Sequence, residues 1–330
     1  MVVRRLLLFL CVIVGLTLRG QTTHSVFGFL ELPSSSHINA LGGSNVSTPE
    51  ADISILFHNP AFLGAEMDKQ GAMSYMNYMG GINVGSAIYG QTIGPRGAWA
   101  AAARYVDYGN FKMINPDGTP TGTFTAKDIV VQGTYSYDLT DRLRGGVTIK
   151  FISSAYEQYT SLALGADAGL SYYDSEKGFG AGVVFKNWGS QIKAYNDSFE
   201  RMPWDIQIGV TKKIPHTPFY LSLTWLNSLE WDLTAASSSG GKDSFSKTLF
   251  KHFVFAVDIV PSQLFYVSVG YNPKRADDFS LTESKGFAGF SLGAGLNIGR
   301  LQAHASWAQH HAAGSSLMLG VNYHFGSKNL

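Results

Sequence analysis

The chain has 330 residues and a formal net charge of +1, and 15% of its residues are charged. This balance provides neither a basic surface for nucleic acid nor an acidic surface for basic partners, so nucleic-acid binding is disfavoured as a function. The length suits either two soluble domains or one large β architecture.

Residues 1–20 are typical of a secretory signal peptide. Arg4 and Arg5 precede the apolar run 6–16, and a small residue lies at the expected cleavage site. The apolar run is too short to cross a bilayer comfortably. The only cysteine, Cys11, falls inside this run. We therefore expect an exported chain without disulfides, thiolate metal sites or a cysteine nucleophile.

Residues 21–70 lack sustained alternation and contain helix signals instead. Thr48, followed by Pro49 and Glu50, predicts a helix that continues to Phe57. A second short helix is predicted between the serines at 34–36 and the glycines at 42 and 43. Two short helices with apolar faces need a surface to pack on. The local sequence leaves open whether they plug a barrel lumen or cover a soluble sheet.

From residue 71 onward, apolar residues alternate with polar or small ones in segments of about ten residues, separated by turn residues. An even number of such segments at this length is typical of an outer-membrane barrel. We therefore predict an all-β fold, a 14-stranded antiparallel outer-membrane β-barrel over residues 71–330, with residues 21–70 as a short helical N-terminal plug. The predicted strands are 71–79, 83–92, 97–107, 128–138, 142–153, 161–173, 179–187, 204–212, 217–226, 250–260, 264–272, 286–298, 300–309 and 317–325.

The lengths of the predicted connections support a membrane barrel. The long connections, near 108–127, 188–203, 227–249 and 273–285, all follow odd-numbered strands, and the tight turns follow even-numbered ones. Membrane barrels have short periplasmic turns and longer external loops. We expect a chain in the outer membrane of a Gram-negative bacterium, in contact with outer-membrane lipid and lipopolysaccharide, with both termini periplasmic.

The last predicted strand has an apolar face that ends close to the end of the chain. Leu317, Leu319 and Val321 alternate with polar or small residues, as a strand between lipid and a polar lumen requires. Gly320, Tyr323 and Phe325 have a spacing that resembles the terminal assembly signal of bacterial outer-membrane barrels, and we predict that they serve as that signal.

The segment 27–63 resembles the N-terminal signature of the PorV/PorQ family. The matching residues are Phe-Gly-Phe-Leu-Glu-Leu-Pro at 27–33, Ala-Leu-Gly-Gly at 40–43 and Asn-Pro-Ala-Phe-Leu at 59–63, so that the plug signature includes Gly42, Gly43, Asn59 and Pro60. This family comprises outer-membrane components of the type IX secretion system and is related to the FadL-like long-chain fatty-acid transporters. The resemblance implies a FadL-like barrel of the type IX secretion and attachment machinery. It also implies the surface protein PorZ as direct partner, with PorU and PorV in the same machinery.

Three functions remain for such a barrel: a scaffold that holds an extracellular partner through its long loops, a FadL-like conduit for long-chain fatty acids or other hydrophobic molecules, and a general porin. A plug of this length argues against the porin. For the scaffold, aromatic residues of the predicted loops are candidate docking residues: Phe111, Tyr195, Phe199, Trp231 and Phe245.

An enzyme would need a nucleophile with a base and an orienting acid. The predicted inward faces contain Asp258, His304, Ser306 and His324. A polar lumen accounts for these side chains without chemistry, and we expect no enzyme, no cofactor and no metal site.

Overall fold

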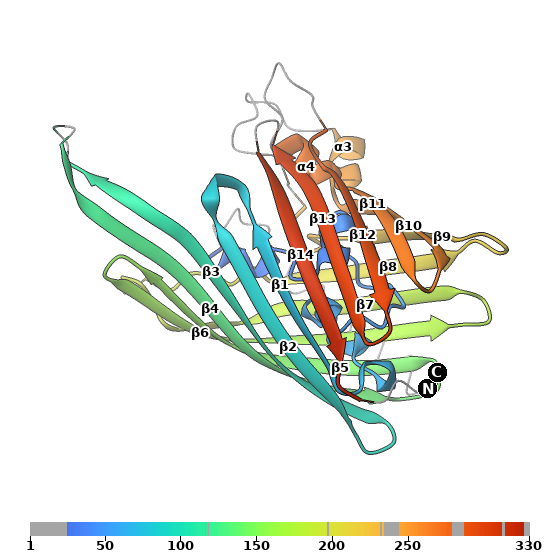
Figure 1. Ribbon diagram of the computed structural model, residues 1–330. Helices are drawn as coiled ribbons and strands as arrows, with labels where there is room; N and C mark the ends of the chain where they lie inside the picture. The colour runs from blue at the N-terminus through green and yellow to red at the C-terminus, as the bar shows by residue number, and fades with distance from the viewer. Residues whose placement is uncertain are drawn as a thin grey trace.

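Fourteen antiparallel strands form a closed barrel, in which each strand pairs with its neighbours in sequence and β1 pairs with β14 (Figure 1). The predicted fold is therefore confirmed. The computed structural model describes residues 25–115, 117, 119–196, 198–231, 233, 244–278, 287–311 and 314–326. The strands are β1 (Gln70–Asn77), β2 (Asn83–Ile93), β3 (Gly97–Ile114), β4 (Pro120–Asp138), β5 (Leu143–Tyr156), β6 (Tyr159–Asp174), β7 (Phe179–Lys193), β8 (Asp205–Lys213), β9 (Phe219–Trp225), β10 (Phe253–Ser262), β11 (Phe265–Tyr271), β12 (Phe290–Ile298), β13 (Leu301–His311) and β14 (Gly314–His324).

The two ends of the barrel differ. The connections 194–204, 226–252 and 272–289 all follow odd-numbered strands and lie at one end, here called the loop end. The other end, here called the turn end, has short connections such as 94–96 and 139–142. Two short helices lie at the loop end, α3 (Phe245–Lys251) and α4 (Pro273–Asp278) (Figure 1).

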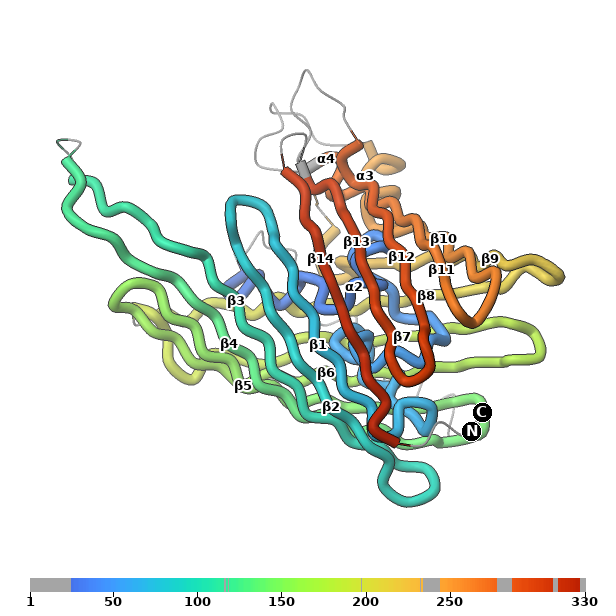
Figure 2. Tube along the Cα trace, viewed as in Figure 1, coloured from blue at the N-terminus to red at the C-terminus, as the bar shows by residue number. Residues whose placement is uncertain are grey.

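Two of the predicted long connections are wrong. Between 108 and 127, β3 and β4 continue as a paired ribbon that projects beyond the neighbouring strands (Figure 2). Phe111 and Phe124 stack across this ribbon with ring centroids 5.1 Å apart. The register shift between Asp107 and Asn110 disturbs the alternation, which explains why the sequence pattern indicated a loop there. The predicted connection 188–203 is also too long, because β7 continues to Lys193.

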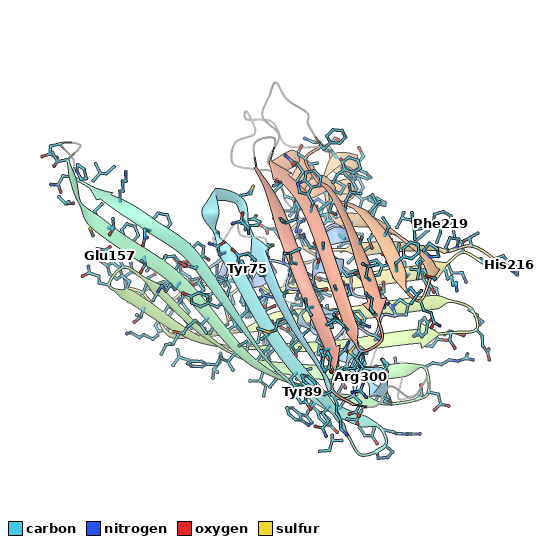
Figure 3. The ribbon with its side chains drawn as sticks, viewed as in Figure 1. Tyr75, Tyr89, Glu157, His216, Phe219 and Arg300 are labelled. Carbon is cyan, nitrogen blue, oxygen red and sulfur yellow. The ribbon has the colours of Figure 1, made fainter. Side chains whose placement is uncertain are left out.

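The barrel wall has an apolar outer face. In β14, Leu317, Leu319 and Val321 are 53%, 50% and 47% exposed, whereas Met318 and Asn322, which alternate with them, are buried. Exposed tyrosines also lie on the outer face, such as Tyr75 toward the loop end and Tyr89 toward the turn end (Figure 3). An apolar exterior with aromatic residues near its edges is the pattern of a barrel surrounded by lipid.

The described residues that precede β1, which begin at Ser25, lie inside the barrel (Figure 2). A predicted helix start at Thr48 is wrong, because Asp52 caps a later turn by accepting a hydrogen bond from Ser54 N (2.8 Å). Among the described residues, no helix is both long and apolar enough to cross a membrane. The short helices of this segment are η1 (Gly28–Glu31), α2 (Ser36–Ala40), η2 (Ile53–Phe57), η3 (Pro60–Phe62) and η4 (Ala65–Met67), and η5 (Met79–Gly81) follows β1.

The plug and the inner wall together form two apolar clusters. The cluster nearer the turn end joins Ile38, Ile53 and Leu63 to wall residues such as Ile88 and Ala100. The other cluster, here called the apolar layer, lies nearer the loop end. It contains Val26, Phe27, Phe29, Leu30, Met76, Val84, Val106, Val130, Ile152, Ala163, Met202 and Met318. The core of this protein is thus the filled lumen.

Candidate functional site in the barrel lumen

The plug fits against glycines of the inner wall. A Cβ at Gly182 would overlap the carbonyl oxygen of Val46, and a Cβ at Gly146 would overlap that of Pro60. At Gly270, on the opposite side, a Cβ would overlap Gly42 N. Only glycine permits such a close approach between wall and plug backbones. The plug is therefore fixed on several sides of the lumen.

Polar contacts attach α2 to the wall formed by β10–β14. Ser36 Oγ donates to Ser306 Oγ (3.0 Å), and Asn39 Nδ2 donates to the same oxygen (3.0 Å). Gly42 N donates to Ser291 Oγ (2.9 Å), and Asn272 Nδ2 donates to Gly42 O (3.2 Å). These bonds hold the first half of the plug signature against the C-terminal strands.

His37 lies between two carboxylates. Its Nε2 is 2.8 Å from Asp258 Oδ1 on β10, and its Nδ1 contacts Glu50 of the plug. Burial alone would lower the pKa of His37, but Glu50 and Asp258 together raise it well above its usual range. The protonated imidazole thus links the plug to the wall.

The second half of the plug signature contacts β5 and β6. Asn59 Oδ1 accepts a hydrogen bond from Ala61 N (3.0 Å), which caps η3, with Pro60 as its first residue. Asn59 Nδ2 donates to Val46 O (3.2 Å) and to Leu170 O (3.4 Å) on β6. Asn59 and Pro60 thus join two parts of the plug to the wall. The other two residues of the plug signature lie elsewhere: Gly42 lies against β10 and β11, and Gly43 lies against the α4 residue Arg275.

A belt of charged side chains points inward from β3 to β8. Lys150 Nζ lies 2.7 Å from Asp167 Oδ2 and donates to Asn187 Oδ1 (2.8 Å). Arg104 donates through Nη1 to Phe29 O (3.0 Å). Lys186 is 6% exposed and makes no hydrogen bond or ion pair with any residue that the structure describes. Lys186 is therefore an enclosed cation with no partner in the part of the chain that the structure describes.

Both carboxylates near Lys186 are satisfied by other donors. Asp167 Oδ1 accepts from Asn187 N (2.7 Å), and its other oxygen meets Lys150. Asp205, the register partner of Lys186 on β8, accepts from the backbone amides of Asn227 (3.1 Å) and Ser228 (2.9 Å). Neither of these two carboxylates forms an ion pair with Lys186.

The short helix η1 has a buried face and an exposed face. Phe29 and Leu30 are buried in the apolar layer, but Gly28 and Glu31 of the same short helix are exposed. No atom lies within 4 Å of the position of a Cβ at Gly28. Glu31 is nevertheless close enough to Lys186, Asp205 and the α4 residue Lys274 to feel their charges. The face of η1 that carries Gly28 and Glu31 is therefore exposed.

The predicted docking aromatics do not form one surface. Phe111 lies in β3, and Tyr195 is half-buried, its hydroxyl donating to Ser154 Oγ (2.5 Å) inside the barrel. Phe199 is exposed after β7. Trp231 and Phe245 are brought together, with ring centroids 5.3 Å apart, and both are exposed.

The residues of the predicted assembly signal lie at successive positions toward the end of β14. Gly320 faces the lumen beside Ser36, whereas Tyr323 and Phe325 face outward with ring centroids 5.0 Å apart. Phe325 also lies 6.0 Å from the ring of Tyr89 on β2. These outward rings form an aromatic group at the turn end.

The inward residues weighed for catalysis do not form a nucleophile and base pair. Ser306 accepts from Ser36 and Asn39, and His304 Nδ1 pairs with the hydroxyl of Tyr266 (2.8 Å). Asp258 pairs with His37, and His324 Nε2 lies 3.1 Å from Gln70 Nε2. Sequence reasoning missed His37, Glu31 and Lys186. A charge on the inward face of a membrane strand was the available signal for Lys186.

The chain matches no protein-family model and no curated protein sequence. Its fold is similar to that of the toluene transporter TbuX of Ralstonia pickettii (12% identity, 91% of this chain and 100% of that chain, TM-score 0.56). It is also similar to the toluene transporter TodX of Pseudomonas putida (11% identity, 88% and 98%, TM-score 0.59) and to a FadL homologue of Pseudomonas aeruginosa (14% identity, 89% and 98%, TM-score 0.53).

These similarities show that the closed barrel has a FadL-like fold. The similar structures are transporters and channels, in keeping with the prediction that the chain is not an enzyme.

Proposed function

We propose that the chain is an outer-membrane conduit for hydrophobic molecules, with its loop end outside the cell and both termini in the periplasm. The apolar layer is the observation that supports this most directly. Phe27, Phe29 and Leu30 place apolar side chains inside the lumen, next to half-buried Leu32 and Trp204. A pore for hydrophilic solutes has no use for such a layer, whereas a hydrophobic ligand gains free energy by contacting it.

The similar structures agree with this proposal. TbuX and TodX are described as toluene transporters, and CymD, another protein of this fold, as a monoaromatic hydrocarbon channel. At 11–12% identity their substrates do not transfer to this chain by similarity alone. These structures make hydrophobic molecules the first class of substrate to test.

Uptake by intact cells tests the conduit. A deletion strain would be supplied with the wild-type gene, with Phe29→Ser or with Phe111→Ser, and given radiolabelled dodecanoate or toluene. We expect Phe29→Ser to reduce uptake because it places a polar group in the apolar layer, and Phe111→Ser on the projecting ribbon to have no effect. Equal uptake by the deletion strain and the wild-type strain would exclude the conduit.

A second candidate is a scaffold of the type IX secretion machinery, as expected for a PorQ-like member of the PorV/PorQ family with an exported, signal-peptide-bearing precursor. The exposed pair Trp231 and Phe245 at the loop end favours it, since aromatic residues are common binding anchors. In this case the partner is PorZ, with PorU and PorV nearby. Replacing both Trp231 and Phe245 by serine should release PorZ into the medium without loss of the barrel. Retention of PorZ on the cell surface by that variant would remove the evidence for docking there.

A further inference from the structure

Large aromatic side chains are exposed together on one side of the loop end. They come from α3, from the connections after β9 and β11, and from the loop-end parts of β10 and β12. These residues are Trp231, Phe245, Phe250, Phe255, Phe287 and Phe290. The exposed fractions of Phe245 and Phe287 reach 70% and 75%. A surface in contact with water rarely carries so much apolar area in one place, so this group needs a medium or a partner that covers it.

A stack of rings joins the connection after β9 to the barrel wall. The ring of His252, which follows α3, is stacked on both Trp225 (centroids 5.5 Å apart) and Trp231 (centroids 5.1 Å apart). The ring centroids of Trp231 and Phe245 are 5.3 Å apart. Trp225 belongs to β9, where it pairs in register with Phe253 of β10. Trp231 and Phe245 are therefore held in place beside the wall.

The helix α3 packs on the outer side of β10. The ring centroids of Phe250 in α3 and Phe255 in β10 are 5.3 Å apart. Phe255 faces outward, because its neighbour Val254 is buried inside the barrel and successive side chains of a strand point to opposite faces. The surface formed by Trp231, Phe245 and Phe250, here called the α3 patch, is thus continuous with the apolar exterior of the wall.

Ion pairs fix the orientation of α3. Lys247 Nζ lies 2.9 Å from Asp277 Oδ1 of α4, and the buried Lys251 also contacts Asp277. The two lysines are one helical turn apart, so the same side of α3 faces α4. Phe245 and Phe250 lie on the exposed side of the helix. The α3 patch is therefore a preformed apolar face on a helix that is braced by its neighbour.

We propose that the α3 patch is immersed in the membrane, with its rings among the acyl chains of the leaflet on the loop-end side. The wall beside the patch already carries outward aromatic residues, which are common where a barrel meets the boundary of the lipid. A short helix with an apolar exposed side and a charged opposite side is also suited to this boundary. In that position Trp231 and Phe245 are covered by lipid and closed to an extracellular protein.

The inference goes beyond the proposed function. It uses the membrane setting of the barrel but needs no conduction of hydrophobic molecules. It assigns a lipid contact to Trp231 and Phe245, which fall in the connection 227–249 that the sequence pattern predicted as an external loop.

Fluorescence of the barrel in lipid nanodiscs, in which both membrane faces are open to solvent, tests the position of the patch. A nitrobenzoxadiazole dye is attached to one new cysteine in a Cys11→Ser background, because Cys11 is the only natural cysteine. The test variants are Phe245→Cys and Phe250→Cys. Leu319→Cys, on the outer face of β14, is the reference for lipid, and Phe111→Cys, on the projecting ribbon, is the reference for water. Heat-modifiable migration on gels checks that each variant is folded.

Each labelled variant is measured with iodide in the solvent and in nanodiscs of phosphatidylcholine that is brominated on its acyl chains. We expect the brominated lipid to quench the dye at Phe245→Cys and Phe250→Cys as strongly as at Leu319→Cys, because bromine quenches only at contact. Iodide stays in water, so it should reduce the fluorescence at Phe111→Cys and leave that of the two test variants unchanged. The emission of the test variants should also be shifted to shorter wavelength than that of Phe111→Cys.

Quenching of Phe245→Cys by iodide as strong as that of Phe111→Cys, with none by brominated lipid, would overturn the inference and leave the patch open to a protein partner. Quenching by brominated lipid at Phe250→Cys alone would overturn it as well, because the lipid contact would then end at the wall. If brominated lipid did not quench Leu319→Cys either, the barrel would not span the membrane, and the proposed function itself would fail.

Discussion

The histidine between Glu50 and Asp258 makes attachment of the plug dependent on pH. His37 has a raised pKa in the folded protein because the two carboxylates outweigh the effect of burial. A raised folded-state pKa stabilises the folded form fully below the unfolded pKa, and this stabilisation is lost as the pH rises through the folded value. Two further residues lie near His37 and Glu50. Asp52 adds negative charge beside Glu50, and the ring of Tyr266 packs against the ring of His37.

Thermal unfolding should therefore show a falling midpoint as the pH rises from about 7 to about 10. In His37→Asn the imidazolium is absent, so the two carboxylates repel each other and the midpoint should be lower already at neutral pH, with little further loss over this range. Circular dichroism at a series of pH values measures the unfolding midpoints of the wild type and of His37→Asn. A wild type and a variant with parallel pH profiles would mean that His37 does not hold the plug.

Single residues also show where sequence reasoning ends. The inward position of Lys186 follows from strand alternation. Its lack of a partner among the described residues depends on Asp205 accepting from an amide 22 residues later. The pairing of His37 with Asp258 joins residues 221 positions apart. Neither relation leaves a local pattern in the sequence, so neither could be predicted.

At the scale of elements, the wall glycines explain how short helices can seal a wide barrel. Gly182→Ala would push the β7 backbone and Val46 apart, at a cost of about 1–3 kcal/mol for overpacking. We expect the plug to shift and the barrel to conduct small ions in planar bilayers. Gly133→Ala is the matched control, since Gly133 faces outward on β4 and a Cβ there meets nothing within 4 Å. If bilayers that contain Gly182→Ala showed no ion conductance, the plug would tolerate the added methyl group.

The aromatic group at the end of β14 leads to a prediction about assembly. Phe325 contacts Tyr323 and Tyr89, and its replacement by serine should reduce the amount of folded barrel in the membrane, because both the signal and the ring contacts are lost. Ile298→Ser removes another exposed apolar side chain at the turn end of β12 and should have a smaller effect. Quantifying heat-modifiable protein in outer-membrane fractions compares the two. Equal yields would argue against a special role for Phe325.

The elements themselves were largely predictable. Alternation located all fourteen strands because a wall with lipid outside and a polar or small-residue interior imposes the same two-residue period throughout. The ribbon of β3 and β4 was missed because outside the lipid both of its faces meet water, so no alternation is required there. The plug helices were indicated by capping residues, but their placement in the lumen depends on contacts with distant strands.

For the whole molecule, the sidedness of the barrel is testable at two matched turns. Glu157 lies at the loop end and His216 at the turn end, and both have positive φ values (Figure 3). A cysteine at Glu157 should react with a membrane-impermeant maleimide on intact cells, whereas one at His216 should react only after the cells are broken. Gel shifts of the labelled protein report both reactions. The reverse pattern would place the loop end in the periplasm.

The plug contacts almost the whole circumference of the wall. Its helix α2 packs on β11 to β14, η2 on β1 and β2, and η3 on β4 to β6. Ser25 lies beside Arg201 in the connection after β7, although β1 starts at the turn end. A closed barrel would have to be threaded to reach this arrangement. We therefore expect the wall to form around the plug, with the pairing of β1 and β14 as the final step, made once the plug is already inside.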